Sequence, residues 1–346
     1  MSVGYLTHPS FRDHAMPGYH HPEGPQRIDA VWEALDRAAL TNRLVSIEPV
    51  EATREMLRAV HTETFIRQLE RLEAENRPVF IDQDTYALPR SFQIARLAAG
   101  ACVRGVEAVI RGEVHTALVA ARPPGHHATP NRAMGFCILS NAAIAARYAI
   151  QQLGLERVLI LDYDVHHGNG TQDAFYDDPS VLFISTHQYP FYPMTGHLDE
   201  TGTGAGAGTT LNIPLPNNTG DTGYQQVFEQ IVWPAVRRYQ PQLIIASVGF
   251  DAHWADPLAQ MRLTLTGYDQ LARSVIAMAD ELCGGRVVFV MEGGYNVTAL
   301  SSGMRNLAHR LLRNADFDDP LGDAPPSREP DLSALIAQIA RLHQLG

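Results

Sequence analysis

The chain alternates between short apolar runs rich in β-branched residues and longer amphipathic segments. Such apolar runs predict strands that are buried on both faces, because a strand with one solvated face would alternate apolar and polar side chains. We expect strands at residues 115–121, 157–165, 181–187, 243–250 and 286–291. Helical patterns occupy residues 91–111, 137–153, 222–239, 266–282 and 296–313. This order predicts an α/β fold in which helices cover both faces of a central parallel sheet.

The pattern continues to about residue 315 without a linker, which predicts a single domain over residues 1–315. With 346 residues, of which 45% are hydrophobic, the chain can bury a large core. Residues 316–346 begin with an acidic, proline-rich segment, DFDDPLGDAPPSREPD, and end in an amphipathic pattern. We expect this last pattern to form a helix that packs on the domain.

The acidic composition argues against two classes of partner. The chain has 27 basic and 38 acidic residues and a net charge of −11, whereas nucleic acids and anionic membranes attract clustered Lys and Arg. The three cysteines form no C-x-x-C pair, so no disulfide framework is expected and a reducing cytoplasm is the predicted compartment. No signal peptide is visible, and the longest apolar runs are too short to span a bilayer.

Polar clusters follow the predicted strands at the point where each strand ends. These clusters are DYDVHH (162–167), STHQ (185–188), GFDAH (249–253) and MEGGYN (291–296). In an open parallel sheet, ligands bind beyond the carboxyl ends of the strands. We therefore expect one edge of the sheet to hold the functional site.

The first of these clusters indicates a metal site. Asp162, Asp164 and His166 alternate along the chain and would share one face of a strand, and Asp251 after another strand is a fourth candidate. Carboxylates that converge in this way repel each other unless a cation lies between them. Two Asp and one His would neutralise a divalent ion and leave a position for water; Zn²⁺ fits best, with Fe²⁺ and Co²⁺ as alternatives. For any single strand end, a hydrogen-bonding cluster without metal is the alternative.

A tandem pair of histidines supplies groups for proton transfer near neutral pH. His126 and His127 follow the tight turn at residues 123–125, which would direct both rings to the same sheet edge. We interpret a second pair, His20 and His21, as part of a surface loop.

A tyrosine follows two glycines after the last predicted strand. Tyr295 could donate a hydrogen bond to an oxygen that gains negative charge beside a metal. An ordinary glycine turn is the alternative interpretation of this stretch.

Taken together, these motifs resemble the histone deacetylase family, in its class II-like branch with bacterial amidohydrolases and the related acetylpolyamine amidohydrolases. The resemblance runs from HPEGPQR (21–27) to EGGYN (292–296) and includes RPPGHH (122–127), GFC (135–137), DYDVHHGNGTQDAF (162–175), STHQYPFYPMTG (185–196), LNIPL (211–215) and GFDAHWADPL (249–258). It implies the arginase/deacetylase fold, with a central parallel sheet of about eight strands. It also implies a zinc-dependent hydrolase that acts on acetylated amines.

The resemblance also assigns roles to individual residues. The implied roles are zinc ligand for Asp164, His166 and Asp251, catalytic pair for His126 and His127, oxyanion donor for Tyr295, and structural K⁺ site for Asp162, Asp164, His166, Ser185 and Thr186. Asp162 would support His126, whereas Asn169 stands where many class I-like members carry an aspartate that supports the second histidine. Because an amide stabilises an imidazolium less than a carboxylate does, we expect His127 to have the lower proton affinity and to act as the base.

A narrow tunnel for the substrate is also implied. Its residues would be Phe136 and Tyr192 as walls, Leu258 at the rim, and Gly135, Gly294 and Asp84 nearby. Aromatic residues also fill hydrophobic cores, so Phe136 and Tyr192 depend on the family match. Arg27 would lie near an internal cavity through which acetate leaves, or else start a helix at the surface.

The sequence is compatible with three functions. Removal of acetyl or other acyl groups from acetyl-lysine-like alkylamines is favoured, because Leu258 is apolar where polyamine-selective relatives carry an acidic residue at the rim. An acetylpolyamine amidohydrolase is the alternative enzyme, with Asp84, Asp199 or Glu200 as the source of charge. A non-catalytic acetyl-lysine-binding protein would be expected to lack a ligand, a histidine or the tyrosine, and none is missing. The expected partner is an acetylated small molecule or peptide; the oligomeric state is left open, a homo-oligomer included.

Overall fold

The computed structural model describes residues 1–345 and contains an eight-stranded sheet in the order β2-β1-β5-β10-β9-β6-β7-β8. All neighbouring strands in this sheet are parallel. Its strands are β1 (Val3–Leu6), β2 (Val45–Ser46), β5 (Thr116–Val119), β6 (Val158–Asp162), β7 (Val181–Gln188), β8 (Thr210–Leu215), β9 (Leu243–Val248) and β10 (Val287–Met291). A separate antiparallel pair joins β3 (Val79–Phe80) and β4 (Tyr86–Ala87).

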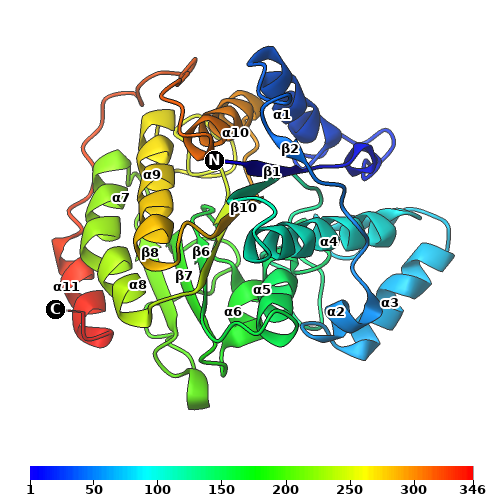
Figure 1. Cartoon of the computed structure of the whole chain (residues 1–346), viewed down its shortest axis with the longest axis horizontal. Helices are drawn as coiled ribbons and strands as arrows, with labels where there is room; N and C mark the ends of the chain where they lie inside the picture. Colours follow the sequence, from blue (N-terminus) through cyan, green and yellow to red (C-terminus); the bar gives the residue numbers. More distant parts are fainter. Residues whose placement is uncertain (346) are drawn as a thin grey trace.

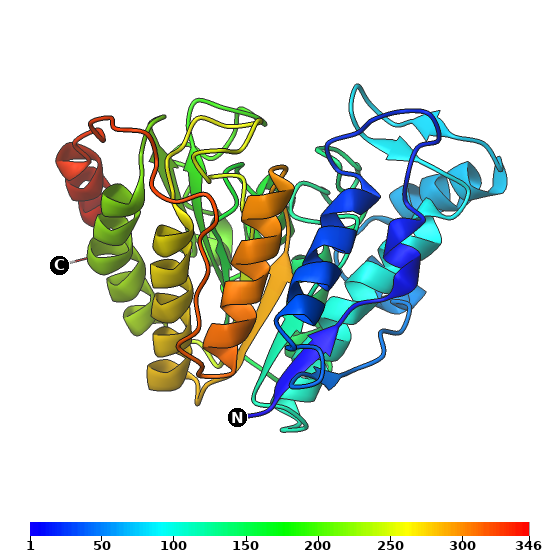
Figure 2. The same cartoon turned by 90° about the horizontal axis from the view of Figure 1, so that it is seen from above.

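Helices cover both faces of this sheet (Figures 1 and 2). One layer consists of α1 (Pro25–Arg37), α7 (Asp221–Val227), α8 (Trp233–Tyr239), α9 (Leu265–Leu282) and α10 (Val297–Leu311). On the other face lie α2 (Arg54–Arg58), α3 (Glu63–Ala74), α4 (Ser91–Ile110), α5 (Asn141–Gln151) and α6 (Asn169–Phe175). The short helices η1 (Pro9–Arg12) and η2 (Gly204–Gly206) lie in connections. The predicted α/β fold, a parallel sheet between two helical layers, is confirmed.

The five strands that the apolar pattern predicts are β5, β6, β7, β9 and β10, so β1 and β2 at one edge and β8 at the other are not among them. Strands β1 and β2 contain only four and two residues, too few to establish a periodicity. The helix expected at 222–239 is a single helical run interrupted by a π-helical turn, η3 (Phe228–Val232), between α7 and α8. The amphipathic helices that precede residue 91 were not predicted, although α1 and α3 bury one face each.

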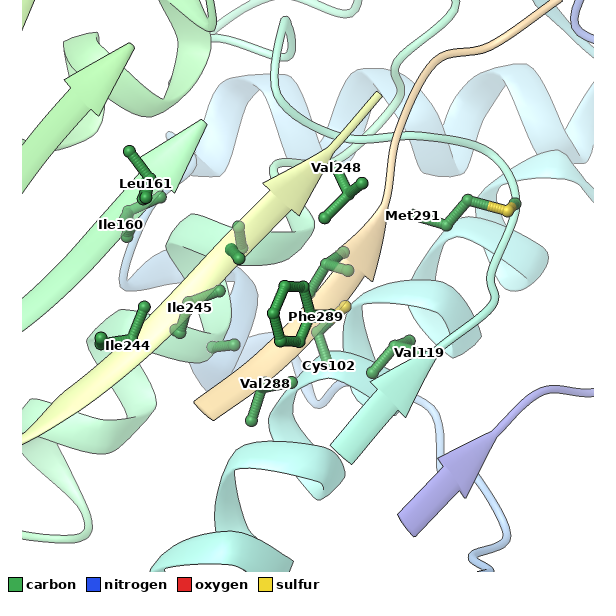
Figure 3. Close-up of a cluster of buried hydrophobic side chains, with 14 of the residues drawn as sticks. Cys102, Val119, Ile160, Leu161, Ile244, Ile245, Val248, Val288, Phe289 and Met291 are labelled. Atoms are coloured by element: carbon green, nitrogen blue, oxygen red, sulfur yellow. The ribbon is translucent and has the colours of Figure 1, made fainter. Parts of the chain in front are cut away.

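The central strands meet in the middle of the hydrophobic core (Figure 3). Ile160 of β6, Ile245 of β9 and Phe289 of β10 have no exposed surface, and Cys102 of α4 packs beside them. Burial of one such apolar side chain contributes about 1.5–3 kcal/mol. The strand ends that lead into the polar clusters are therefore held by a dense apolar core.

The C-terminal segment lies along the layer formed by α7, α8 and α9 (Figure 2). The Glu329 carboxylate accepts hydrogen bonds from the N–H groups of Gly220, Thr222 and Gly223 at the start of α7. Helix α11 (Ser333–Leu342) packs against η3 and buries Ile336 and Ile339. Within residues 1–345, no helix is both long and apolar enough to cross a membrane.

Candidate functional site

Four neighbouring strands deliver the candidate residues to one edge of the sheet. Strands β5, β10, β9 and β6 lie side by side in that order. The segments that follow them carry, respectively, His126 with His127, Tyr295, Asp251, and Asp164 with His166. The expectation that the strand ends converge is met by the topology, since all these strands are parallel.

Asp164, His166 and Asp251 form a compact group. One ligand atom from each lies within 4.8 Å of the others. His166 Nδ1 is 3.2 Å from Asp164 Oδ1 and 3.3 Å from Asp251 Oδ2. Asp251 Oδ2 is buried, and apart from this approach of His166 it has no hydrogen-bond partner among the described residues. A buried carboxylate oxygen of this kind is costly unless something outside the chain binds it.

Two glycines allow the carboxylates to approach the backbone. A Cβ at Gly293 would lie 2.1 Å from Asp251 Oδ2, and a Cβ at Gly249 would lie 2.1 Å from Asp164 Oδ2. Because Gly293 has no Cβ, its N–H can approach Asp164 Oδ2 and donates to it at 2.8 Å. Any side chain at either position would displace the two aspartates, which explains glycine at the ends of both strands.

The charges of this group match a divalent cation. Burial opposes charge on His166, yet the carboxylates of Asp164 and Asp251 raise the pKa of His166 to about 9. Burial and the Asp164 charge also raise the pKa of Asp251. The two carboxylates therefore attract positive charge to this group. Carboxylate and imidazole are also ligand types that Zn²⁺ accepts.

His126 and His127 occupy different electrostatic environments. His126 Nδ1–H donates to Asp162 Oδ2 at 3.0 Å, whereas His127 Nδ1–H donates to the amide oxygen of Asn169 at 2.8 Å. Burial opposes charge on both rings. The Asp164 and Asp162 carboxylates nevertheless raise the pKa of His126 to about 10. The pKa of His127 is held well below its usual value by burial and by the neighbouring His126.

Tyr295 lies in the turn between β10 and α10. Burial raises the pKa of its phenol well above the usual value, so the hydroxyl remains a hydrogen-bond donor near neutral pH. The Arg27 guanidinium lies 5.1 Å from the centre of the Tyr295 ring. Arg27 also donates to the carbonyl oxygens of Gly294, at 2.8 Å, and Glu292.

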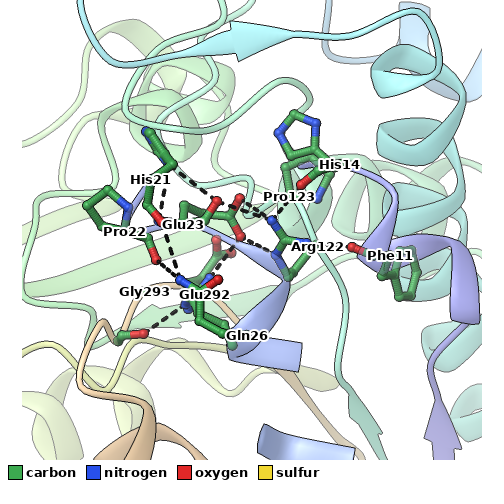
Figure 4. A network of polar contacts seen from close by, with 12 residues as sticks. Phe11, His14, His21, Pro22, Glu23, Gln26, Arg122, Pro123, Glu292 and Gly293 are labelled. Atoms are coloured by element: carbon green, nitrogen blue, oxygen red, sulfur yellow. Dashed lines mark hydrogen bonds and ion pairs between the residues drawn. The ribbon is translucent and has the colours of Figure 1, made fainter. Parts of the chain in front are cut away.

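Arg27 binds a buried ionic network in which Glu23 pairs with Arg122 (Figure 4). Glu23 Oε1 accepts hydrogen bonds from Arg27 at 3.1 Å and from Arg122 at 2.5 Å, and all three side chains are fully buried. Arg122 also donates to the backbone carbonyls of Phe11 and His14. The surface alternative for Arg27 is therefore wrong, and no sequence spacing indicates these partners, because Glu23 and Arg122 are 99 residues apart.

Glu292 is a buried acid that the sequence analysis left without a role. Its carboxylate accepts the N–H groups of Gly125, at 2.7 Å, and His126, at 3.3 Å. Burial raises the pKa of Glu292 to about 7. Ligand atoms of His126, Cys137 and Glu292 form a second close group, and His126 Nε2 lies 3.8 Å from Asp164 Oδ1 of the first. The signal that could have found Glu292 is its position directly after an apolar strand, the same signal that singled out Asp162.

Aromatic rings surround the approach to the two groups. Tyr192 makes an edge contact with His127, at 5.2 Å between ring centres, and Phe136 makes one with Tyr295 at 5.7 Å. His21 contacts Phe136 at 4.6 Å, and its Nε2 lies 2.9 Å from the carbonyl oxygen of Asp84. The interpretation of His21 as a surface residue is therefore wrong, because its ring supports a wall of the approach; His20 is exposed.

The remaining residues that the resemblance predicts are Gly135 and Leu258 of the tunnel and Ser185 and Thr186 of the K⁺ site. Gly135 has a positive φ, and a Cβ there would lie 2.4 Å from the His127 ring. Leu258 is half-buried, and its N–H donates to the Asp256 carboxylate. Ser185, paired in register with Asp162, is fully buried, as is Thr186, whose hydroxyl has no partner within the described chain.

Comparisons with known proteins agree with this arrangement. The model of the histone deacetylase domain matches residues 21–311. A probable deacetylase of Archaeoglobus fulgidus is 44% identical over 299 residues, which cover 86% of this chain and 82% of the relative. A histone deacetylase-like amidohydrolase of Pseudomonas aeruginosa is 37% identical over 328 residues, covering 94% and 86% of the two chains.

A solved structure has the same fold. The crystal structure of the HDA15 HD domain superposes with a TM-score of 0.89 at 34% sequence identity, covering 99% of this chain and 94% of that one. The family match spans most of the chain and includes all the motifs that carry the resemblance. The chain therefore belongs to the histone deacetylase family, a family of hydrolytic deacetylases.

Proposed function

We propose that this protein is a zinc-dependent amidohydrolase that removes acetyl groups from acetyl-lysine-like alkylamines. The observation that carries the proposal is the convergence, at one sheet edge, of the Asp164–His166–Asp251 group with two histidines of opposite proton affinity. Neither an acetyl-lysine reader nor a structural metal site requires a basic and an acidic histidine side by side. Tyr295 adds a neutral donor to the same edge.

Asp164, His166 and Asp251 would hold the zinc ion. When bound there, Zn²⁺ would polarise the amide carbonyl and lower the pKa of water. The buried Asp251 oxygen without a partner supports this assignment. A K⁺ ion is proposed for the adjacent residues Asp162, Asp164, His166, Ser185 and Thr186, where the Thr186 hydroxyl also has no partner in the described chain.

The side chains of the site divide the proton transfers among them. Since His127 Nδ1–H is engaged by Asn169, Nε2 is the nitrogen that takes the proton from water as it attacks the carbonyl. Tyr295 donates its hydroxyl proton in a hydrogen bond to the oxygen that becomes negative, and one such donor contributes roughly 3–4 kcal/mol. His126 keeps its positive charge beside Asp162 and stabilises negative charge nearby. His127 then returns its proton to the leaving amine.

The aromatic approach supports an extended alkylamine as the substrate. Phe136 and Tyr192 offer apolar walls to a methylene chain. A cationic polyamine would need a partner for its internal ammonium, because a charge in an apolar tunnel is costly unless it is paired. Half-buried Leu258 provides none, so acetyl-lysine peptides are the favoured class.

An acetylpolyamine amidohydrolase is the second candidate. Asp84 supports it, because this carboxyl is half-buried beside the approach and its charge contributes to raising the pKa of Tyr192. The variant L258E would supply a charge at the rim and should shift kcat/KM toward acetylspermidine relative to an acetyl-lysine peptide. A parent enzyme that already prefers acetylpolyamines would contradict the acetyl-lysine assignment and leave the second candidate in its place.

The test of the proposal combines metal content with activity. The purified protein is assayed against acetyl-lysine peptides and acetylpolyamines, before and after chelation and after addition of Zn²⁺. Chelation should abolish turnover, and D251N should lose both metal and activity, whereas E156Q at an exposed carboxylate to which no role in the site is assigned should retain both. Full metal occupancy in D251N, or turnover that survives chelation, would contradict the proposed site.

A further inference from the structure

Asp256 connects two parts of the site that lie far apart in the sequence. Its Oδ2 atom accepts the N–H groups of Tyr295, at 2.7 Å, and Asn296, at 3.0 Å. Its Oδ1 atom accepts the N–H of Leu258 at 2.9 Å. Only 6% of Asp256 is exposed, so water does not compete strongly for these hydrogen bonds.

The turn that carries Tyr295 has little regular structure of its own. Strand β10 ends at Met291 and helix α10 begins at Val297, and Gly294 between them has a φ of +118°. Backbone hydrogen bonds tie its first residues to the end of β9, from Glu292 N–H to Val248 O at 2.9 Å and from Phe250 N–H to Gly293 O at 3.0 Å, whereas glycine at 294 leaves the following backbone with wide conformational freedom. Its conformation must therefore be fixed by groups outside it.

Two buried side chains, Arg27 as a donor and Asp256 as an acceptor, hold the backbone of this turn. Arg27 binds the carbonyl oxygens of Glu292 and Gly294, while Asp256 binds the N–H groups of Tyr295 and Asn296. The loop around Asp256 makes one further contact, since Asn296 Nδ2 donates to the carbonyl of Ala255. Asp256 is thus the group that fixes the backbone of the tyrosine itself.

We propose that Asp256 is a positioning residue that holds the Tyr295 hydroxyl where negative charge develops, and that it ties this position to the tunnel rim at Leu258. The inference rests on the proposed deacetylase function. Asp256 acts through Tyr295 and touches no reacting atom. An oxyanion donor is effective only when it is held in place in advance, so loss of the anchor should cost rate more than substrate affinity.

The variant D256N separates this role from simple loss of structure. An amide matches the carboxylate in shape but presents one oxygen and one NH₂ group. Either the Tyr295 turn or the Leu258 rim must then face a donor instead of an acceptor. We expect kcat to fall on the order of 10-fold to 100-fold, with a smaller change in KM.

The decisive experiment is a double-mutant cycle with Y295F. If Asp256 acts through the phenol, D256N should lower kcat in the parent but by no more than roughly twofold in the Y295F background, because the hydroxyl that it positions is already gone. An equal fold-loss in both backgrounds, or a loss confined to KM, would overturn the inference.

A matched control and a second variant accompany the cycle. Glu329 also accepts three backbone N–H groups, at the remote start of α7, so E329Q should leave kcat unchanged in both backgrounds. Should D256N not fold, D256E keeps a carboxyl group on a longer side chain, and its cost in kcat should also vanish in the Y295F background; an undiminished cost there overturns the inference. An inactive parent would refute the proposed function, whereas an active parent with additive losses refutes only the role of Asp256.

Discussion

The two adjacent histidines show how one neighbouring atom sets the role of a residue. Both rings are buried, yet a carboxylate faces His126 and an amide faces His127. An amide oxygen can accept the N–H of neutral imidazole but adds no net charge to stabilise imidazolium. Burial and the neighbouring His126 therefore hold the pKa of His127 well below its usual value, whereas the Asp164 and Asp162 carboxylates overcome burial and raise the pKa of His126.

The variant N169D should convert the environment of His127 into that of His126. The new carboxylate would raise the pKa of His127, and a general base works only when deprotonated, so the acid limb of the kcat/KM profile should move to higher pH. Below the new pKa, activity should fall about tenfold per pH unit. A pH–rate profile measures this shift, and N169A, which adds no charge, is the control. Superimposable acid limbs for N169D and the parent would show that His127 is not the base.

Sequence reasoning located residues whose position alone marks them. Asp164, His166 and Asp251 stand at strand ends, where a polar side chain after an apolar run signals a site. Asp256 and Glu23 carry no such signal, because their importance depends on which backbone groups they meet after folding. Even the buried ring of His21 was assigned to the surface, since a histidine in a loop carries no periodicity that reports burial.

At the scale of elements, a local pattern predicts the elements that it marks along the sequence, and it does not predict those that are defined by tertiary contacts. The central strands were predicted because burial on both faces makes them continuously apolar. The edge strand β2 consists of two exposed residues and is defined only by its pairing with β1. Helix α1 is attached to the turn after β10 through Arg27, which also pairs with Glu23. This attachment likewise depends on tertiary contacts and not on helical propensity.

Neutralising Glu23 should weaken the attachment of α1 to this turn and lower the free energy of unfolding. E23Q would leave Arg27 and Arg122 buried without their shared carboxylate, and breaking a buried ion pair typically costs about 3–5 kcal/mol. Burial opposes the charge, but the two arginines lower the pKa of Glu23 to about 2, so the carboxylate is charged at neutral pH. Urea unfolding measures the loss. E33Q is the matched control, since Glu33 forms the same i, i+4 pair with Arg37 at the surface and should change stability by less than about 1 kcal/mol. Equal losses in the two variants would contradict the importance of burial.

At the scale of the whole molecule, buried neutral histidines make stability depend on pH. His61 donates from Nδ1 to the carbonyl of Thr129 and accepts the N–H of Ser140 at Nε2, both at 3.0 Å. A proton on Nε2 would face that N–H, and burial lowers the pKa of His61 to about 4. The unfolded chain takes up this proton below about pH 6.5. The free energy of unfolding should therefore decrease as the pH falls from about 6.5 to about 4.

The variant H61Q should make the free energy of unfolding depend less on pH, because the unfolded variant takes up one proton fewer. Unfolding free energies measured between pH 4 and 7 should show a slope for H61Q that is smaller than that of the parent by about 1.4 kcal/mol per pH unit. Comparing slopes cancels the contribution of other buried groups, including Glu292, whose raised pKa acts in the opposite direction. H20Q, at an exposed histidine, should keep the parental slope, and a parental slope in H61Q would refute the role of His61.

The order of strands in the sheet has a consequence for how the protein is made. Strands β9 and β10 lie between β5 and β6, although the ribosome synthesises them after both. Until residues near 290 have emerged, the nascent chain holds β5 and β6 as two open strand edges, the kind of surface that chaperones shield from aggregation. Insertion of β9 and β10 joins the two halves of the sheet. It also brings Asp251 and Tyr295 to the histidines and the aspartate that follow β5 and β6. A nascent chain that lacks β9 and β10 also lacks Asp251 and Tyr295, so we expect it to have no deacetylase activity.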